Sequence, residues 1–387
     1  MNVGFITRHI KHAIIWFFEK YTESKKINMT SLLDPIKFKR GPELKNRFFL
    51  APLTNQQSNE DGTLGEDEFK WLTMRAKGGF GMTMTCASHV QENGKGFPGQ
   101  LGIWDDRHIP GLTRLASEIK QSDSVAIVQL HHGGLRATKE VIGETPVSAS
   151  DHAESGSRGL STAEVEKVVQ DFIAAGKRAE EAGYHGVELH GAHSYLLCNF
   201  LSAGINQRTD KYGGSPEKRA RILYEIIDGI RNTCSEDFIL GVRLSAEKFG
   251  MRTVDSVSIA RQLMQDNVID FLDMSLWDSF KDAEDEEYAG RSLMSLFTEL
   301  DRKDVKLGVA GKIRTPADAE KAMSAGVDWV MLGRAAMLEF DFPNKYTSDA
   351  NFKPIEMPVP RKYLTEQGLS ETFQTYVRGR WPEFFAD

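Results

Sequence analysis

The chain has 387 residues, of which 40% are hydrophobic and 27% are charged, with a formal net charge of −7. This length suits one large α/β domain, and the 34 glycines and 13 prolines are scattered, which excludes a low-complexity chain. The basic residues are not clustered, so nucleic acid is not an expected partner.

The three cysteines, Cys86, Cys198 and Cys234, are far apart in the sequence. They cannot supply an iron–sulfur cluster, a cysteine-based zinc site or a disulfide framework. A reducing, cytoplasmic compartment is therefore expected. No run of about 18 apolar residues is present, so no membrane span is expected.

The first 28 residues carry a helical pattern of their own. Arg8 and Lys11 precede the first acid, Glu19, and large apolar residues recur at helical spacing at Ile6, Ile10, Ile14, Phe17 and Tyr21. One interpretation is an organelle-targeting or membrane-surface helix. The other is a tail or helical arm upstream of a start at Met29.

Residues 46–340 alternate short, β-rich apolar runs with longer helical patterns. Such alternation predicts a parallel sheet, and eight units close a (β/α)8 TIM barrel. The candidate strands are Phe48–Ala51, Gly81–Ala87, Val125–Leu130, Gly186–His190, Phe238–Leu244, Phe271–Ser275, Lys306–Ala310 and Trp329–Gly333.

Two helix starts are well marked. Ser161 and Glu164 form a capping-box pattern that opens a helix reaching about Glu181. Ser215 with Pro216 predicts a second start, because proline suits the first helical turn.

In a barrel of this kind, chemistry is performed at the carboxyl ends of the strands. The first strand ends at Thr54, whose hydroxyl can bond a cofactor carbonyl, although a simple turn explains it equally well. The third carries Gln129, whose amide can both donate and accept. An interior polar residue is the alternative there.

The fourth strand ends with His190, His193 and Tyr195. Imidazoles at this position can polarise a substrate oxygen, and a phenol can deliver a proton. The spacing of the histidines also permits zinc, with His131 and His132 as further ligands. Core histidines without a function are the third interpretation.

The last strands point to a charged ligand. Arg243 on the fifth strand either pairs with a barrel carboxylate or balances negative charge on a flavin. Gly311 after the seventh strand, with Gly333 and Arg334 after the eighth, lie where these barrels bind phosphate. From the residues alone, we predict a barrel enzyme with a phosphate-bearing cofactor.

Several strings, taken together, resemble the old yellow enzyme family from about residue 31 to 341. They are Leu44–Arg47, Ala51–Thr54, Gly102–Asp106, Gln129–Gly134, His190–Leu196, Phe200–Ser202 and Asn206–Glu217. The resemblance implies non-covalent FMN, NADPH or NADH as reductant, and small activated alkenes, either α,β-unsaturated carbonyl or nitro compounds, as substrates. It also implies that His190 and His193 bind the substrate oxygen and that Tyr195 donates a proton. The implied flavin contacts are Pro52, Leu53, Thr54, Ala87, Gln129, Arg243, Gly311, Gly333 and Arg334.

The resemblance divides the chain into an extension (1–30), an FMN-binding barrel (31–345) and a C-terminal tail (346–387). The tail loosely resembles a segment that inserts an arginine into a partner's site, which makes Arg378 or Arg380 a candidate in a homo-oligomer. Two rival functions remain open. One is a metal-dependent hydrolase or lyase that uses His190 and His193, and the other is a non-catalytic barrel that senses a flavin or nucleotide.

Overall fold

Eight parallel strands close into a barrel in the computed structural model, which describes residues 30–386. The prediction for residues 1–28 lies outside the described residues. The chain divides between Ser31 and Leu32 into two units, and the barrel belongs to the second. Its strands are β3 (Phe48–Leu50), β4 (Met82–His89), β5 (Val125–His131), β8 (Gly186–Gly191), β9 (Ile239–Ser245), β10 (Phe271–Ser275), β11 (Lys306–Ala310) and β12 (Trp329–Leu332). The predicted fold class is confirmed.

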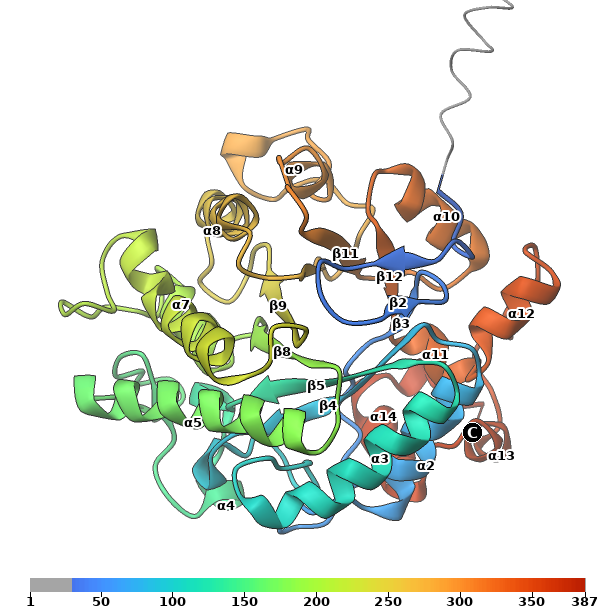
Figure 1. The fold of residues 1–387 in the computed structure, drawn as a ribbon, viewed down its shortest axis with the longest axis horizontal. Coiled ribbons are helices and arrows are strands. Elements are labelled where there is room, and N and C mark those ends of the chain that lie inside the picture. Colours follow the sequence, from blue (N-terminus) through green and yellow to red (C-terminus); the bar gives the residue numbers. More distant parts are fainter. Residues whose placement is uncertain (1–29, 387) are drawn as a thin grey trace, which may run out of the picture. The chain divides into compact units, whose positions relative to one another are not determined.

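Helices surround the barrel (Figure 1). Those that follow successive strands are α2 (Glu66–Lys77), α3 (Ile109–Gln121), α5 (Thr162–Glu181), α7 (Pro216–Thr233), α8 (Thr253–Asp266), α9 (Ser295–Thr298), α10 (Pro316–Ser324) and α11 (Arg334–Leu338). Shorter additions are α4 (Lys139–Ile142), α6 (Leu196–Leu201), α12 (Phe342–Ser348), α13 (Arg361–Glu366) and α14 (Glu371–Arg380). Two short pairs of strands lie outside the barrel: β1 (Ile36–Lys37) with β2 (Glu43–Leu44), and β6 (Val147–Ser148) with β7 (Arg158–Gly159).

The helix boundaries follow local chemistry. The Ser161 side chain accepts from the Glu164 backbone N–H, and the Glu164 carboxylate accepts from the Ser161 N–H, so the predicted capping box opens α5. The Ser215 side chain caps α7 by accepting from the Lys218 backbone N–H, with Pro216 in the first turn. After α5 the chain turns at Gly183 with φ +81°, a conformation that favours glycine.

An aromatic cluster fills the end of the barrel opposite the strand carboxyl ends. The hairpin of β1 and β2 carries Phe38, whose ring stacks on Phe271 at 5.3 Å and meets the edge of Phe49 at 6.2 Å. Trp329 stacks on Phe49 at 4.3 Å. A side chain at Gly308 would place its Cβ 2.1 Å from the Trp329 ring, so the packing requires glycine there.

We expect Phe38→Ala to lower the free energy of unfolding by about 3–5 kcal/mol, because the substitution leaves a cavity beside the rings of Phe49 and Phe271. Urea unfolding followed by circular dichroism measures the effect. Ile355→Ala is the matched control, because Ile355 is already 37% exposed. Equal effects for the two variants would show that the hairpin does not close the barrel core.

The C-terminal segment packs against α2. The Phe373 ring of α14 meets the edge of Trp71 at 4.9 Å, and Arg75 donates to the Gln367 carbonyl at 2.6 Å. Beyond this contact, the Tyr376 hydroxyl hydrogen-bonds the Thr54 side chain. Because Thr54 follows β3, the end of α14 lies at the mouth of the barrel.

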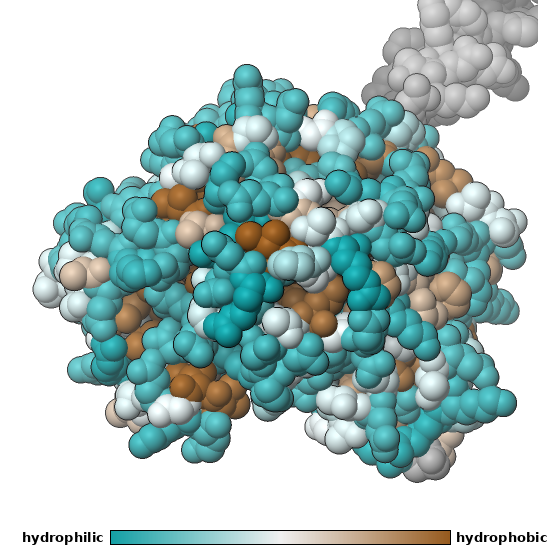
Figure 2. Space-filling model, turned by 60° about the horizontal axis from the view of Figure 1, so that its bottom comes forward, coloured by the Kyte–Doolittle hydropathy of each residue, from teal (hydrophilic) through white to brown (hydrophobic). Residues whose placement is uncertain are grey.

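The surface in Figure 2 is mainly hydrophilic, with hydrophobic residues gathered in separate patches. Among residues 30–386, the large hydrophobic side chains with the greatest exposure are Leu33, Trp277 and Ile355. No helix in this part of the chain is long and apolar enough to cross a membrane.

Candidate active site

The turn that follows β8 brings the predicted histidines and tyrosine together. His190 is in the strand, while His193 and Ser194 both have positive φ, at +62° and +61°. Two consecutive non-glycine residues in this region are strained, and such strain is concentrated at functional sites. The turn directs His193 back toward His190 and places Tyr195 at the start of α6.

Three imidazoles form a chain of hydrogen bonds that ends on a hydroxyl. His131 Nδ1 lies 3.0 Å from His190 Nδ1, and His190 Nε2 lies 3.0 Å from His193 Nδ1. His193 Nε2 lies 2.7 Å from the Ser275 hydroxyl at the end of β10. Burial lowers the pKa of all three imidazoles well below the usual value, so each is neutral at neutral pH and carries one N–H.

The direction of this chain follows from the remaining atom, His131 Nε2, which is buried without a hydrogen-bond partner among the described residues. An unpaired buried acceptor is more tolerable than an unpaired buried N–H. The protons are therefore assigned so that His131 donates to His190, His190 to His193, and His193 to Ser275. This assignment gives both His190 and His193 an Nε2–H donor.

Tyr195 lies against the same histidines. Its ring centre is 4.2 Å from that of His131 and 4.9 Å from that of His190. Burial raises the pKa of the Tyr195 hydroxyl, and the charges of Arg136 and Arg380 oppose this shift without reversing it. The phenol is therefore protonated at neutral pH and can act as an acid.

Beneath the histidines, a buried network crosses the barrel. Gln129 donates to Glu188 at 2.7 Å, and its own Oε1 is buried without a partner among residues 30–386. Arg243 Nε lies 2.9 Å from Asp273 Oδ2, but the atoms are not aligned for a hydrogen bond. Burial raises the pKa of both carboxyls, Glu188 and Asp273. Arg243 thus has a barrel carboxylate beside it. It also remains near the mouth, where its Nη2 lies 3.5 Å from the Ser275 hydroxyl.

The loops after β11 and β12 form a cavity of about 180 Å3 with the upper barrel. Gly311 has φ +151°, and a Cβ there would lie 3.0 Å from backbone atoms of Trp277 and Asp278. Arg314 and Arg334 both line the cavity, and burial, followed by the charge of Arg314, lowers the pKa of Arg334. Two neighbouring guanidinium groups without an ion-paired carboxylate among the described residues are suited to an anion. The cavity lining is Ala51, Leu53, Arg243, Ser275, Trp277, Ala310, Gly311, Lys312, Ile313, Arg314, Met331, Gly333, Arg334 and Trp381.

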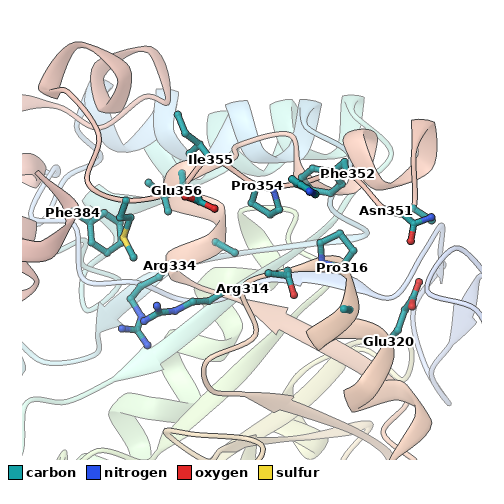
Figure 3. A pocket seen from close by; sticks show the side chains of 17 residues that line it. Arg314, Pro316, Glu320, Arg334, Asn351, Phe352, Pro354, Ile355, Glu356 and Phe384 are labelled. Carbon is teal, nitrogen blue, oxygen red and sulfur yellow. The ribbon is translucent and has the colours of Figure 1, made fainter. Parts of the chain in front are cut away.

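Arg314 and Arg334 also border a second, larger groove of about 660 Å3, separate from this cavity (Figure 3). In Figure 3 their guanidinium groups lie together at one end of the groove, and Phe352 and Pro354 form its apolar wall. The groove holds none of the histidines, so its size does not make it the reacting site.

The remaining predicted contacts lie on neighbouring strands. Ala87 on β4 is beside Gln129 on β5. Leu53 lines the cavity and lies 3.4 Å from a Cβ built at Gly333. Pro52 connects β3 to this loop, and Thr54 contacts Tyr376. The structure thus places all predicted residues around the carboxyl end of the barrel.

The metal interpretation finds no support in residues 30–386, where no group of three or more His, Cys, Asp or Glu residues is arranged to hold an ion. His132 instead bonds Gln91 at 2.9 Å, and His131 takes part in the imidazole chain.

Among the residues that the sequence did not predict are Arg314, Ser275, Tyr376 and Trp381. Arg314 follows Gly311 by three positions, so the same loop motif could have indicated it. Ser275 ends the sixth strand, which the rule on strand ends could have included. Tyr376 and Trp381 carry no local signal, because only the packing of α14 brings them to the mouth.

The residues present fit a flavin phosphate ester. Arg314 Nε is buried without a hydrogen-bond partner among the described residues, and Gln129 Oε1 is a free acceptor suited to a ring N–H. Arg243 supplies positive charge in the same cavity as Arg314.

Comparison with known proteins agrees with this geometry. The model of the NADH:flavin oxidoreductase / NADH oxidase family matches residues 31–353. A probable NADH-dependent flavin oxidoreductase, YqiG of Bacillus subtilis, is 37% identical over 319 residues, covering 80% of this chain and 85% of that protein. The NADPH dehydrogenase of the same organism is 32% identical over 326 residues, covering 83% and 94%.

Solved structures show the same fold. An old yellow enzyme homologue from Zymomonas mobilis aligns with a TM-score of 0.75 at 24% identity, over 89% of this chain and 99% of that chain. A 2-naphthoyl-CoA reductase complex aligns with a TM-score of 0.74 at 28% identity, over 83% of this chain but only 52% of that chain. The chain belongs to the NADH:flavin oxidoreductase / NADH oxidase family, that of the old yellow enzymes, and is an NAD(P)H:flavin oxidoreductase with FMN as its cofactor.

Proposed function

We propose that this enzyme reduces the activated C=C bond of α,β-unsaturated carbonyl or nitro compounds. The observation that carries the proposal is the grouping of two neutral histidines and a protonated tyrosine beside the cavity that contains Arg243. Bound FMN would supply the redox chemistry, accepting hydride from NAD(P)H and passing it to the β-carbon of the alkene.

The protein would supply polarisation and a proton. The Nε2–H groups of His190 and His193 would donate to the substrate oxygen in place of their present partners, His193 Nδ1 and Ser275. Their donation would withdraw electrons from the β-carbon and stabilise the negative charge that develops on the oxygen. Tyr195 would then protonate the α-carbon.

The cofactor would be held from three sides. Arg314 and Arg334, with the backbone at Gly311 and Gly333, would bind the phosphate, while Gln129 and Arg243 would contact the ring. Glu188 supports the position of Gln129. Because the Gln129 amide N–H donates to Glu188, the Gln129 Oε1 is directed away from that carboxylate. Pro52, Leu53, Thr54 and Ala87 would complete the contacts on the strands nearest to Gln129 and Gly333.

The pH dependence of alkene reduction provides one check. Because burial raises the pKa of Tyr195 above its ordinary value of 10.0, the proton donor is present below that raised pKa and is lost only as the pH rises through it. We expect the rate of alkene reduction by the reduced enzyme to be constant from neutral pH to beyond pH 10. A rate of alkene reduction that instead fell at or below pH 10 in the wild type, with no such fall in Tyr195→Phe, would mean that the Tyr195 hydroxyl titrates with an ordinary or lowered pKa. That result would contradict the assignment.

The function is tested by the absorbance of the purified, FMN-loaded protein. Anaerobic NADPH or NADH should bleach the flavin band, and cyclohexenone should restore it. If NADPH or NADH bleached the flavin band but cyclohexenone did not restore it, the proposed alkene substrate would be wrong. A flavin that is never bleached would favour a sensor.

A further inference from the structure

We propose that the alkene substrate also carries a carboxylate group, recognised by Arg136 and Arg380 at the mouth of the barrel. The inference rests on the proposed alkene reduction and narrows its substrate class. It starts from two guanidinium groups that the assigned chemistry of flavin and histidines does not use.

Arg136 lies directly beside the acid of the proposed reaction. Its guanidinium carbon is 4.8 Å from the centre of the Tyr195 ring, and one nitrogen donates to the His193 carbonyl at 2.9 Å. These contacts fix the side chain over the reacting groups while using a single N–H. The other N–H groups remain free to bind a ligand.

Arg380 reaches the same place from the other end of the chain. It is the last residue of α14, one turn after Tyr376, which contacts Thr54, and next to Trp381, which lines the flavin cavity. Burial raises the pKa of the Tyr195 and Tyr376 hydroxyls, and the charge of Arg380 in the same chain opposes that rise at both. The candidate arginine of the C-terminal segment thus lies at the mouth of its own barrel.

Neither guanidinium forms an ion pair within residues 30–386. On the opposite rim, Arg314 and Arg334 are assigned to the flavin phosphate, and the lysines are paired: Lys281 with Glu247 and Glu284, and Lys312 with Asp278 at 2.9 Å. Apart from the arginines of the flavin cavity, the unpaired positive charge at the mouth thus lies on the Tyr195 side, in a chain whose net charge is −7. Such a local field attracts an anionic substrate.

The geometry favours a carboxylate. A guanidinium is a planar fork of donors that matches a planar carboxylate with two parallel hydrogen bonds. A carboxylate is a poor activating group for an alkene, so the carbonyl bound by His190 and His193 is a separate group on the same molecule. A 4-oxo-2-enoate has both groups across one double bond.

The test compares 4-oxopent-2-enoate with its methyl ester, which has the same alkene and ketone but no charge. Stopped-flow reoxidation of the NADPH-reduced enzyme gives the second-order rate constant for each. Bonds to a charged group predict a preference for the acid of about ten- to one-hundred-fold. Because both arginines are exposed, added salt should lower the rate with the acid and leave the rate with the ester nearly constant.

Substitution identifies the residues responsible. Arg136→Gln and Arg380→Gln should each reduce the ratio of the two rate constants, and the double variant should bring it near one. Arg261→Gln on the outer helix α8 is the matched control and should keep the wild-type ratio. Flavin content and melting temperature show that each variant is folded.

The outcomes separate the two proposals. Reoxidation by the ester, with no preference for the acid, would overturn the carboxylate inference and leave alkene reduction standing. A preference that survives the double substitution would also overturn it. Reoxidation by neither compound, nor by cyclohexenone, would overturn alkene reduction itself and the inference with it.

Discussion

Tyr195→Phe is expected to slow alkene reduction by about 100- to 10,000-fold, the usual contribution of a positioned general acid. The variant keeps the ring that packs on His131 at 4.2 Å and loses only the hydroxyl. Reduction of the flavin by NADPH requires no proton from this residue, so its rate should remain within about twofold of the wild type. Stopped-flow absorbance measures the two half-reactions separately.

The matched control is Tyr224→Phe, which removes a hydroxyl bonded to Asp266 on the outside of the barrel. It should leave both half-reactions unchanged. If Tyr195→Phe slowed flavin reduction and alkene reduction equally, the residue would be supporting the flavin site and not donating a proton.

The fold was predictable because its signals are local and repeated. Each strand is a short apolar run, and capping residues such as Ser161 and Ser215 mark where helices begin. The eightfold alternation then leaves few alternatives to a barrel. The closing hairpin was missed, because strands of two residues carry no periodic pattern and Phe38 is explained only by the aromatic rings it meets.

The site was predictable where its residues end the strands. His190, Gln129 and Arg243 are examples, since the barrel itself brings strand ends together. The unpredicted part comes from long-range packing. Arg380 reaches the mouth because α14 packs on α2, a contact between residues about 300 positions apart in the chain. No spacing in the sequence indicates which arginine of the segment that contact brings to the mouth.

The buried carboxyls show a third limit of prediction from the sequence. The sequence allowed Arg243 either a carboxylate partner or a flavin, and the structure places Asp273 beside it while leaving it in the cavity lining. The alternatives were not exclusive. Glu188 was not considered, although it lies two residues before His190 and holds the amide of Gln129. A side chain that acts through another is difficult to recognise without coordinates.

The second large effect is expected from His190→Ala combined with His193→Ala. Removing one donor to a developing negative charge typically slows a reaction by about 100- to 1000-fold, so the double variant should lose at least that much in alkene reduction. The reason lies in the proton assignment, which gives each imidazole an Nε2–H donor near Ser275 and Tyr195. The same variant should bind phenolate ligands, which resemble the charged form of the substrate oxygen, correspondingly more weakly.

Titration of the flavin absorbance with a substituted phenol measures that binding without turnover. His152→Ala is the matched control, since His152 bonds Ser155 in a loop outside the barrel. Unchanged phenol affinity in the double variant would remove both histidines from the oxygen-binding role. Loss of phenol affinity together with normal flavin content and normal reduction by NADPH would separate oxygen binding from cofactor binding, because Gln129, Arg314 and Arg334 remain in place to hold the flavin.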